Sequence, residues 1–302
     1  MSPLLPGAGA FATYGVTFSD FDDDGDPDLY VANDKHAGNQ MWRNDGPGCD
    51  GWCFTNVSEA WHADLEADSM GIAMGDYDND LDLDLSVTDN HRHNIVRNMV
   101  ETGAPSFVDV SDDVGVIFDA YGWGTIFFDY DNDGWLDLYV ADANLGDGES
   151  SRLFHNELAT FVEVTAGCGC AEPGWSHGVT HADYDHDGAL DLAVGQRGLR
   201  HLLYRNRNAS GNHWLEVELH GGGPVNRDAV GARVWVATTS YRVLMRDVEL
   251  GSSVASQNSL RLHFGLGSDE VAAIQIRWPD GTIEAPPPPA TDSLWVHTYP
   301  GG

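Results

Sequence analysis

The sequence predicts an all-β fold in which a β-propeller of four repeated blades, residues 1–210, precedes a β-sandwich-like domain, residues 211–302. Three observations support this prediction. An acidic motif recurs four times at intervals of 53 to 56 residues. Each repeat contains short apolar runs separated by Gly, Asn and Asp, with little sign of a helix. The last segment lacks the acidic motif but alternates apolar and polar residues as strands do.

The motif occupies nine residues of every repeat, 20–28, 76–84, 129–137 and 183–191. A glycine stands five residues before each motif, and an aromatic residue follows its first Asp. An apolar run comes next, followed by an Arg-Asn or His-Asn pair, and three repeats close with Phe-x-x-Val. Four short strands per repeat are what a propeller blade requires.

The fourth repeat departs from this plan, because after Asn206 it enters a Gly/Asn-rich linker without a Phe-x-x-Val segment. Propellers can complete a blade with a strand from one terminus, so the segment near Phe11 is one candidate for the missing strand. A strand from another molecule is the other candidate, and it would produce a homo-oligomer or filament.

Acidic residues outnumber basic ones by 48 to 15, giving a net charge of −33, and only 12 of the acids are Glu. Asp suits loops and the ligation of hard cations rather than helices. A generally acidic surface, as in proteins of high-salt organisms, is the alternative explanation. Such a charge repels phosphate backbones and anionic membranes, and no apolar run approaches the roughly 20 residues of a membrane span. We therefore expect neither nucleic-acid binding nor membrane insertion.

The aspartates of each motif stand at positions 1, 3, 5 and 9, with glycine at position 6 in three of the four copies. Ca²⁺ takes six to eight oxygen ligands at flexible distances, which such a loop can supply if the carbonyl at position 7 contributes. Mg²⁺ fits less well because it demands a tight octahedron. An EF-hand is excluded because the flanking segments are β-like and no regular Glu occupies position 12. The sequence thus predicts up to four calcium ions.

The predicted side-chain ligands are Asp20, Asp22, Asp24, Asp28, Asp76, Asp78, Asp80, Asp84, Asp129, Asp131, Asp133, Asp137, Asp183, Asp185, Asp187 and Asp191. The predicted backbone carbonyl ligands are Asp26, Asp82, Trp135 and Ala189. Loop 2 places Leu81 at position 6. If φ is positive there, Leu costs about 1 kcal/mol, so we expect loop 2 to be distorted or to bind more weakly unless Asp82 compensates.

The four cysteines form two local pairs, Cys49 with Cys53 and Cys168 with Cys170, which two disulfides would explain. A zinc site is the competing interpretation, although the usual C-x-x-C spacing is absent. The opening, Met1 to Ala10, has neither the basic nor the apolar region of a signal peptide. Either the numbering begins on a trimmed chain, or export is inferred from the cysteines and the expected calcium.

In the C-terminal segment, strands are predicted at 213–219, 232–236, 260–264, 273–277 and 294–299, with a stiff extended loop at 286–289. The repeats over residues 12–206 resemble the FG-GAP or VCBS repeats of extracellular propellers, including those of integrin α-chains. That resemblance implies that the aspartates at positions 1, 3, 5 and 9 bind calcium. The C-terminal segment is similar to the ASPIC/UnbV domain of cartilage acidic protein-like proteins, through residues 226–234, 251, 256–258, 262–267 and 277–281. The resemblance implies an extracellular protein associated with matrix or adhesion.

Nothing in the sequence demands catalysis, because it contains no phosphate-binding loop, G-x-S-x-G elbow or H-E-x-x-H motif. The pairs His91/His93 and His181/His186 are the best catalytic or transition-metal candidates, and solvated or hydrogen-bonded histidines are the alternative. We predict a secreted or cell-surface calcium-binding structural or adhesion protein whose partner is matrix, glycan or protein. A carbohydrate-binding module or a calcium-dependent polysaccharide lyase or hydrolase is the alternative function.

Overall fold

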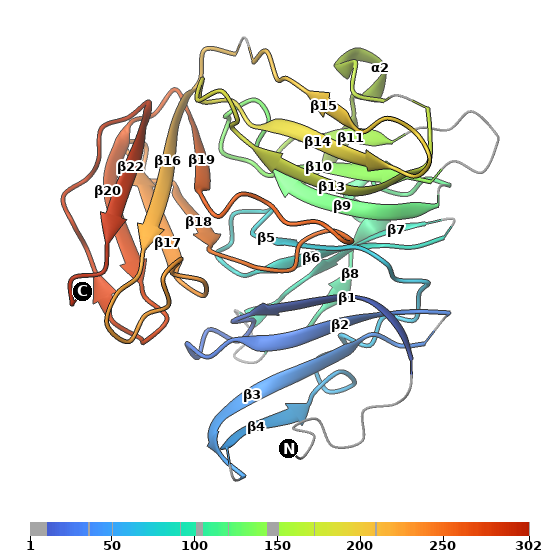
Figure 1. Cartoon of the computed structure of the whole chain (residues 1–302), viewed down its shortest axis with the longest axis horizontal. Helices are drawn as coiled ribbons and strands as arrows, with labels where there is room; N and C mark the ends of the chain where they lie inside the picture. The colour runs from blue at the N-terminus through green and yellow to red at the C-terminus, as the bar shows by residue number, and fades with distance from the viewer. Residues whose placement is uncertain are drawn as a thin grey trace.

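The computed structural model describes residues 11–35, 37–49, 51–90, 92–100, 105–119, 121–143, 151–171, 173–208 and 210–301. As predicted, it is almost entirely β, with six sheets (Figure 1). Four sheets are the blades, which follow one another around a common axis in chain order. The other two sheets form a C-terminal domain that packs beside one end of the blades.

Blade 1 comprises β1 (Ala12–Ser19), β2 (Asp28–Asp34), β3 (Gln40–Gly48) and β4 (Gly51–Asn56). Blade 2 comprises β5 (Ile72–Gly75), β6 (Asp84–Thr88), β7 (His93–Arg97) and β8 (Val108–Asp109), followed by the one-turn helix α1 (Ser111–Val114). Blade 3 comprises β9 (Gly122–Phe128), β10 (Asp137–Asp142), β11 (Arg152–Asn156) and β12 (Phe161–Glu163), followed by α2 (Thr165–Cys168). Blade 4 comprises β13 (Ser176–Ala182), β14 (Asp191–Gln196) and β15 (Leu202–Tyr204). Strands within a blade pair antiparallel in sequence order, and in the described part of the chain no fourth strand pairs with β15.

The repeated glycine before each motif allows the inner strands to approach one another at the axis. A Cβ atom on Gly71 would lie 2.2 Å from the Trp123 carbonyl oxygen of the next blade. On Gly124 it would lie 2.2 Å from the His177 carbonyl oxygen. Any side chain at these positions would therefore force neighbouring blades apart.

The apolar cores lie between adjacent blades, so an inner blade buries both faces of its sheet. One cluster joins blades 1 and 2, a second joins blades 2 and 3, and a third joins blades 3 and 4. This explains why β6 and β10 are buried at every residue instead of alternating.

The C-terminal domain is a sandwich, as expected. One sheet places β16 (His213–His220) between β19 (Leu262–Gly267) and β22 (Ser293–Thr298), with β16 and β22 parallel. The other contains β18 (Val243–Asp247), β17 (Arg233–Thr238), β20 (Val271–Arg277) and β21 (Ile283–Glu284), in that order. The strands β18 and β21 were not predicted from sequence. Residues 286–289 connect β21 to β22 without regular secondary structure.

Residues 248–258, here called the axial loop, leave the C-terminal domain and cross the propeller axis (Figure 1). Isolated β-bridges join Leu250 to Phe18 of blade 1 and Ser253 to Ile72 of blade 2. On blade 4, a Cβ atom at Gly178 would lie 2.8 Å from the Val254 carbonyl oxygen. The axial loop thus takes the place that the inner strand of a following blade would occupy.

The element between the inner strands of blades 4 and 1 therefore comes from the C-terminal domain. Phe11, near one of the two candidates for the missing strand of blade 4, directly precedes β1 in blade 1, and residues 1–10 lie outside the described residues. The axial loop supplies no outer strand, so β15 keeps an open edge within the described residues.

The cysteines form the two predicted local disulfides, Cys49–Cys53 and Cys168–Cys170, with Cα–Cα distances of 5.7 and 5.1 Å. The competing four-cysteine zinc site is therefore wrong. Across the described residues, no helix has the length and apolar character needed to cross a membrane.

Candidate metal centres

The four acidic loops share one backbone conformation. Position 4 has φ between 57 and 63° in every copy, namely at Asp23, Asn79, Asn132 and His186. Position 6 has φ between 76 and 98°, at Gly25, Leu81, Gly134 and Gly188. The condition for strain at Leu81 is therefore met, since its φ is 76°.

Two carboxylates stabilise each loop through its backbone N–H groups. The Asp at position 1 accepts a hydrogen bond from the N–H at position 6, at 2.8 to 3.2 Å in all four copies. The Asp at position 5 accepts one from the N–H at position 7, at 2.8 to 3.1 Å. Loop 2 makes both bonds, so Leu81 does not distort its backbone. Weaker binding by loop 2 stays a prediction, as does ligation by the carbonyls of Asp26, Asp82, Trp135 and Ala189.

The Asp at position 9 joins the loop to the third strand of the same blade. In blade 3, Asp137 Oδ2 accepts from the Tyr130 N–H at 2.9 Å, and its Oδ1 accepts from the Asn156 N–H at 2.8 Å. The same pair of bonds recurs in the other three blades, at Asp28, Asp84 and Asp191. These four carboxylates are at most 2% exposed.

The loops nevertheless contain carboxylate oxygens without a donor. Within the described residues, no hydrogen-bond donor reaches one buried oxygen each of Asp20, Asp22, Asp76, Asp78 and Asp131. Carboxylate oxygens lie within 4.8 Å of one another in loops 1, 2 and 3, in the groups Asp20/Asp22/Asp28, Asp76/Asp78/Asp80/Asp84 and Asp129/Asp131/Asp133. A buried, unpartnered carboxylate oxygen is costly unless a cation or a proton neutralises it.

Burial, reinforced by the neighbouring carboxylates, raises the pKa values of these aspartates. The pKa rises to about 6 for Asp22 and Asp78, about 7 for Asp76 and about 8 for Asp28. Near neutral pH and without a cation, part of each cluster is therefore protonated.

A basic side chain from the Arg-Asn or His-Asn pair flanks each loop. Arg97 contacts Asp78 at 2.7 Å and Asp80 at 2.8 Å through their Oδ2 atoms, whereas the buried Asp78 Oδ1 has no hydrogen-bond partner among the described residues. Arg205 contacts Asp185 and Asp187 of loop 4 in the same way.

Loops 1 and 3 differ from this arrangement. Arg43 pairs with Asp45 outside loop 1, at 2.6 Å. In loop 3, His155 replaces the arginine, and its Nδ1 lies 3.1 Å from Asp137 Oδ1. That hydrogen bond raises the pKa of His155 to about 9, so the imidazole is cationic as arginine would be.

The C-terminal domain covers loops 1, 3 and 4 with groups that the sequence did not single out. Arg277 pairs with the Asp20 carboxylate and Arg233 with that of Asp23, both in loop 1. Arg242 donates to the Asp133 carbonyl at 3.0 Å, and a His263 ring nitrogen lies 3.1 Å from the Gly188 carbonyl. Arg233, His263 and Arg277 lie in segments whose alternation of polar and apolar residues predicted only a strand, and Arg242 lies outside the predicted strands.

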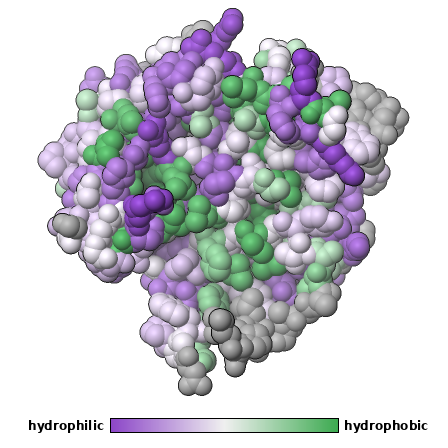
Figure 2. All heavy atoms as spheres, viewed as in Figure 1, coloured by the Kyte–Doolittle hydropathy of each residue, from purple (hydrophilic) through white to green (hydrophobic). Residues whose placement is uncertain are grey.

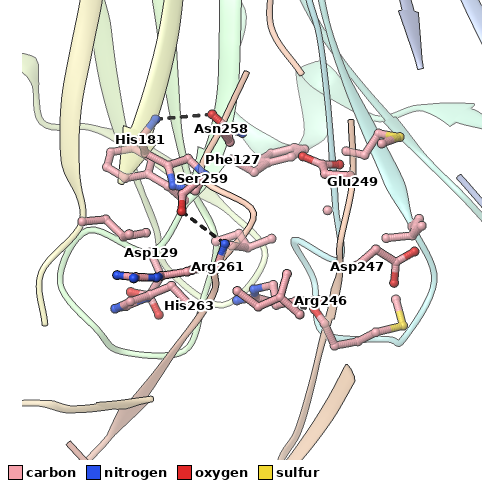
Figure 3. A pocket seen from close by; sticks show the side chains of 18 residues that line it. Phe127, Asp129, His181, Arg246, Asp247, Glu249, Asn258, Ser259, Arg261 and His263 are labelled. Carbon is pink, nitrogen blue, oxygen red and sulfur yellow. Dashed lines mark hydrogen bonds between the residues drawn. The ribbon is translucent and has the colours of Figure 1, made fainter. Parts of the chain in front are cut away.

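A cavity of about 70 Å³ lies between the C-terminal domain and the blades. Figure 3 shows Asp129 of loop 3 close to His263, with Arg246 on another wall. Arg246 is attracted by both Asp76 and Asp129, while burial lowers its pKa. The cavity therefore borders loop 3 at the interface between the domains, whereas Asp24 of loop 1 and Asp185 and Asp187 of loop 4 are exposed.

The structure describes three of the four histidines in the predicted pairs. His91 lies outside the described residues. His93 is buried, and its Nε2 lies 2.9 Å from the Ser86 hydroxyl. His181 is held in β13, whereas exposed His186 in loop 4 lies beside Arg261. His186 also lies near Asp183 and Glu216, a buried carboxylate of the C-terminal domain that was not predicted.

Comparison with known proteins agrees with this architecture. An FG-GAP-like repeat family matches residues 20–87 and 129–194, and the ASPIC and UnbV family matches residues 222–301. The chain is 26% identical over 269 residues to human cartilage acidic protein 1, covering 85% of this chain and 39% of that protein. It is 25% identical over 266 residues to the Xenopus tropicalis protein of the same name, covering 85% and 40%. The chain therefore spans about two fifths of the length of these relatives.

Proposed function

We propose that this chain, with its FG-GAP-like repeats and its ASPIC and UnbV domain, is part of an extracellular calcium-binding structural or adhesion protein. Calcium in the four loops would hold the blades rigid and fix the C-terminal domain against them. The observation that carries the proposal is the set of buried carboxylate oxygens that no donor among the described residues reaches. The aspartates at positions 1, 3, 5 and 9 would hold the ions, which would neutralise the clustered charge.

The ligand set favours calcium over other metals. It consists of carboxylate oxygens, which suit a large hard cation, whereas cysteine sulfur is absent from the loops. An extracellular location follows from the same chemistry, because extracellular calcium can fill sites of modest affinity. Two disulfides and the similarity to cartilage acidic protein 1 support that location.

Removal of calcium tests the proposal. We expect EDTA to lower the melting temperature strongly, since each site at a hundredfold excess over its Kd contributes about 2.7 kcal/mol. Titration calorimetry should find four ions, and Asp78→Asn should remove one of them. Asp113→Asn, which changes an exposed acid outside the loops, is the matched control. A melting temperature that is the same in calcium and EDTA would refute calcium as a structural ion.

Blade 4 supports a second part of the proposal, assembly through a donated strand. In blades 2 and 3 the closing residues Phe107 and Phe161 pack near Phe21 and Tyr77, at ring-centroid distances of 6.0 and 5.6 Å. The equivalent aromatic residue for blade 4 is Tyr130, which lines a cavity of about 330 Å³. A Phe-bearing strand added to the open edge of β15 would fill this cavity.

A fluorescent peptide of residues 159–165, which carries the closing segment of blade 3, is a direct probe of this edge. We expect it to bind and to increase in fluorescence anisotropy. The same peptide with alanine in place of its Phe should bind much more weakly. Equal anisotropy for both peptides would contradict strand addition at β15.

A further inference from the structure

Loop 4 meets the C-terminal domain through a carboxylate, whereas the other loops meet it through arginine. The first aspartates of loops 1 to 3 are each attracted by a guanidinium group of that domain, from Arg277 or Arg246. The first aspartate of loop 4, Asp183, lies instead beside Glu216 of β16. Figure 2 shows hydrophilic and hydrophobic side chains intermixed where the C-terminal domain, on the left of this view, meets the blades. Polar groups therefore take part in this boundary.

The pleat of the C-terminal sheet directs Glu216 at the propeller. Leu215 and Val217, its neighbours on β16, are fully buried in the core of the sandwich, so Glu216 lies on the opposite face of the sheet. The residue paired with it on β19 is His263, whose ring nitrogen lies 3.1 Å from the Gly188 carbonyl of loop 4. Both strands thus present this face of the sheet to loop 4.

The Glu216 carboxylate is buried without a partner. Its residue is 3% exposed, and no described residue donates a hydrogen bond to the carboxylate. Arg261 attracts it, but the Nε of Arg261 donates to Glu218 at 2.7 Å. Burial and the neighbouring charge of Asp183 raise the pKa of Glu216 to about 7. Two buried carboxylates side by side require a cation or a proton between them.

His186 is the third member of this cluster. One ligand atom each of Asp183, His186 and Glu216 lies within 4.8 Å of the other two. His186 occupies position 4 of its loop, where loops 2 and 3 have an asparagine that donates to the position 6 carbonyl of the following loop, at 3.2 and 2.9 Å. The C-terminal domain follows loop 4, and His186 lies beside that domain's Glu216.

We propose that Asp183, His186 and Glu216 form a site for Zn²⁺ or a similar divalent transition-metal ion, which joins loop 4 to the C-terminal domain. Two carboxylate oxygens and one imidazole nitrogen are ligands that zinc accepts, whereas calcium prefers oxygen alone. Three protein ligands leave a position for water, which has access because His186 is exposed. The ion supplies the cation that the buried Glu216 lacks.

This site differs from the calcium site proposed for loop 4 and does not depend on it. Glu216 and His186 are not among the proposed calcium ligands, and Asp183, the shared residue, has two oxygens with which to serve both ions. Arg261 opposes the transition-metal ion, because its charge lies at the edge of the cluster and its Nη1 is 3.3 Å from His186 Nδ1. Arg261→Met should therefore strengthen binding of the ion.

Titration of the calcium-saturated full chain with Co²⁺ tests the inference, since Co²⁺ replaces Zn²⁺ and absorbs visible light. We expect one equivalent of Co²⁺ to produce the absorption of four- or five-coordinate cobalt and one equivalent of Zn²⁺ to abolish it. Glu216→Gln and His186→Asn should each weaken Co²⁺ binding at least about tenfold, because even a group that only supports a ligand contributes 10- to 100-fold. Asparagine suits position 4, as loops 2 and 3 show, and circular dichroism confirms that both variants fold.

The matched controls are Glu270→Gln and His220→Asn, which change an exposed carboxylate and an exposed imidazole of the same domain outside the cluster. Both should bind Co²⁺ as the wild type does. Zn²⁺ should also slow proteolysis between β15 and β16 in the wild type but not in Glu216→Gln. Calcium stoichiometry, which should be the same in all variants, separates failure of this inference from failure of the calcium proposal.

Three results would overturn the inference. The first is wild-type protein that binds no Co²⁺ in calcium, and the second is Co²⁺ binding that neither cluster variant weakens. The third is a Glu216→Gln variant that loses a calcium ion, which would assign Glu216 to the calcium site of loop 4.

Discussion

Position 6 of the acidic loops shows how a single backbone angle limits the residue that can occupy it. Gly25 has φ of 98° and faces open space, so a methyl group there meets no neighbouring atom. Leu81 has the same type of conformation in loop 2, and its side chain packs against the apolar cluster between blades 1 and 2. The packing of Leu81 therefore offsets part of the cost of its backbone conformation.

Gly25→Ala should lower the free energy of unfolding by about 1 kcal/mol, since only the backbone conformation is penalised. Chemical denaturation in saturating calcium measures this change. Gly51→Ala is the control, because Gly51 also faces open space but lacks a positive φ. An equal effect of the two substitutions would show that the left-handed conformation is not the cause.

The pKa values of the loop aspartates predict opposite pH dependences with and without calcium. Burial raises the pKa of Asp28 to about 8 and that of Asp22 to about 6, both above the value in the unfolded chain. A carboxyl group whose pKa is higher in the folded than in the unfolded chain contributes its full stability at pH values below the unfolded-state pKa. This contribution is lost as pH rises through the folded-state pKa. In EDTA the melting temperature should therefore increase as the pH is lowered from about 8 to about 5. In calcium it should fall over the same range as protons displace the ion, and identical trends would contradict this prediction.

At the scale of strands and loops, the asparagines of the Arg-Asn and His-Asn pairs in blades 2 to 4 donate to the preceding blade and so join elements that are distant in sequence. Asn156 is fully buried, and its Nδ2 donates to both the Tyr77 and Leu136 carbonyls. Asn44 occupies the same place in blade 1 but lacks the bond to a preceding blade. The two positions therefore provide a matched pair for measuring that bond.

Asn156→Ala should destabilise the chain more than Asn44→Ala, by about 1 kcal/mol for the additional hydrogen bond and up to about 3 kcal/mol if the Tyr77 carbonyl stays unsatisfied. Denaturant unfolding of both variants under conditions where the protein is monomeric gives the difference. Equal destabilisation would mean that the inter-blade bond adds nothing to stability.

The acidic loops and most strands, β18 and β21 excepted, could be predicted because they depend on local patterns. The repeated glycine, the alternating apolar residues and the Asp spacing each determine structure within a few residues. The axial loop could not be predicted, since nothing in residues 248–258 indicates which distant strands they contact. The contacts of Arg233 could not be predicted either, because in the sequence it is a single polar residue at the start of an alternating run. In the structure its side chain is 1% exposed and pairs with Asp23 of loop 1.

At the scale of the whole molecule, Arg233 connects the two domains. It pairs with Asp247 within the C-terminal domain and with Asp23 of loop 1, and it donates to the Asp20 carbonyl at 2.9 Å. Removing one member of a buried ionic group leaves the others uncompensated, which costs roughly 3–5 kcal/mol.

Arg233→Met should therefore destabilise the contact between the domains and separate their unfolding. We expect calorimetry to show two transitions where the wild type shows one, and limited proteolysis to cut between β15 and β16. Arg227→Met is the control, because Arg227 is exposed and, among the described residues, forms an ion pair only with its neighbour Asp228. A single transition with wild-type protease resistance would show that Arg233 is not needed for docking.

The position of the axial loop also constrains how the protein is made. The inner strands of all four blades are synthesised before residues 248–258, so they emerge from the ribosome before the segment that fills the propeller axis. Contacts between Leu250 and Phe18 span more than two hundred residues, and such distant pairings form late because a long loop must close first. Until the C-terminal domain emerges and its axial loop contacts the inner strands, we expect those strands to be accessible to chaperones or to other nascent chains.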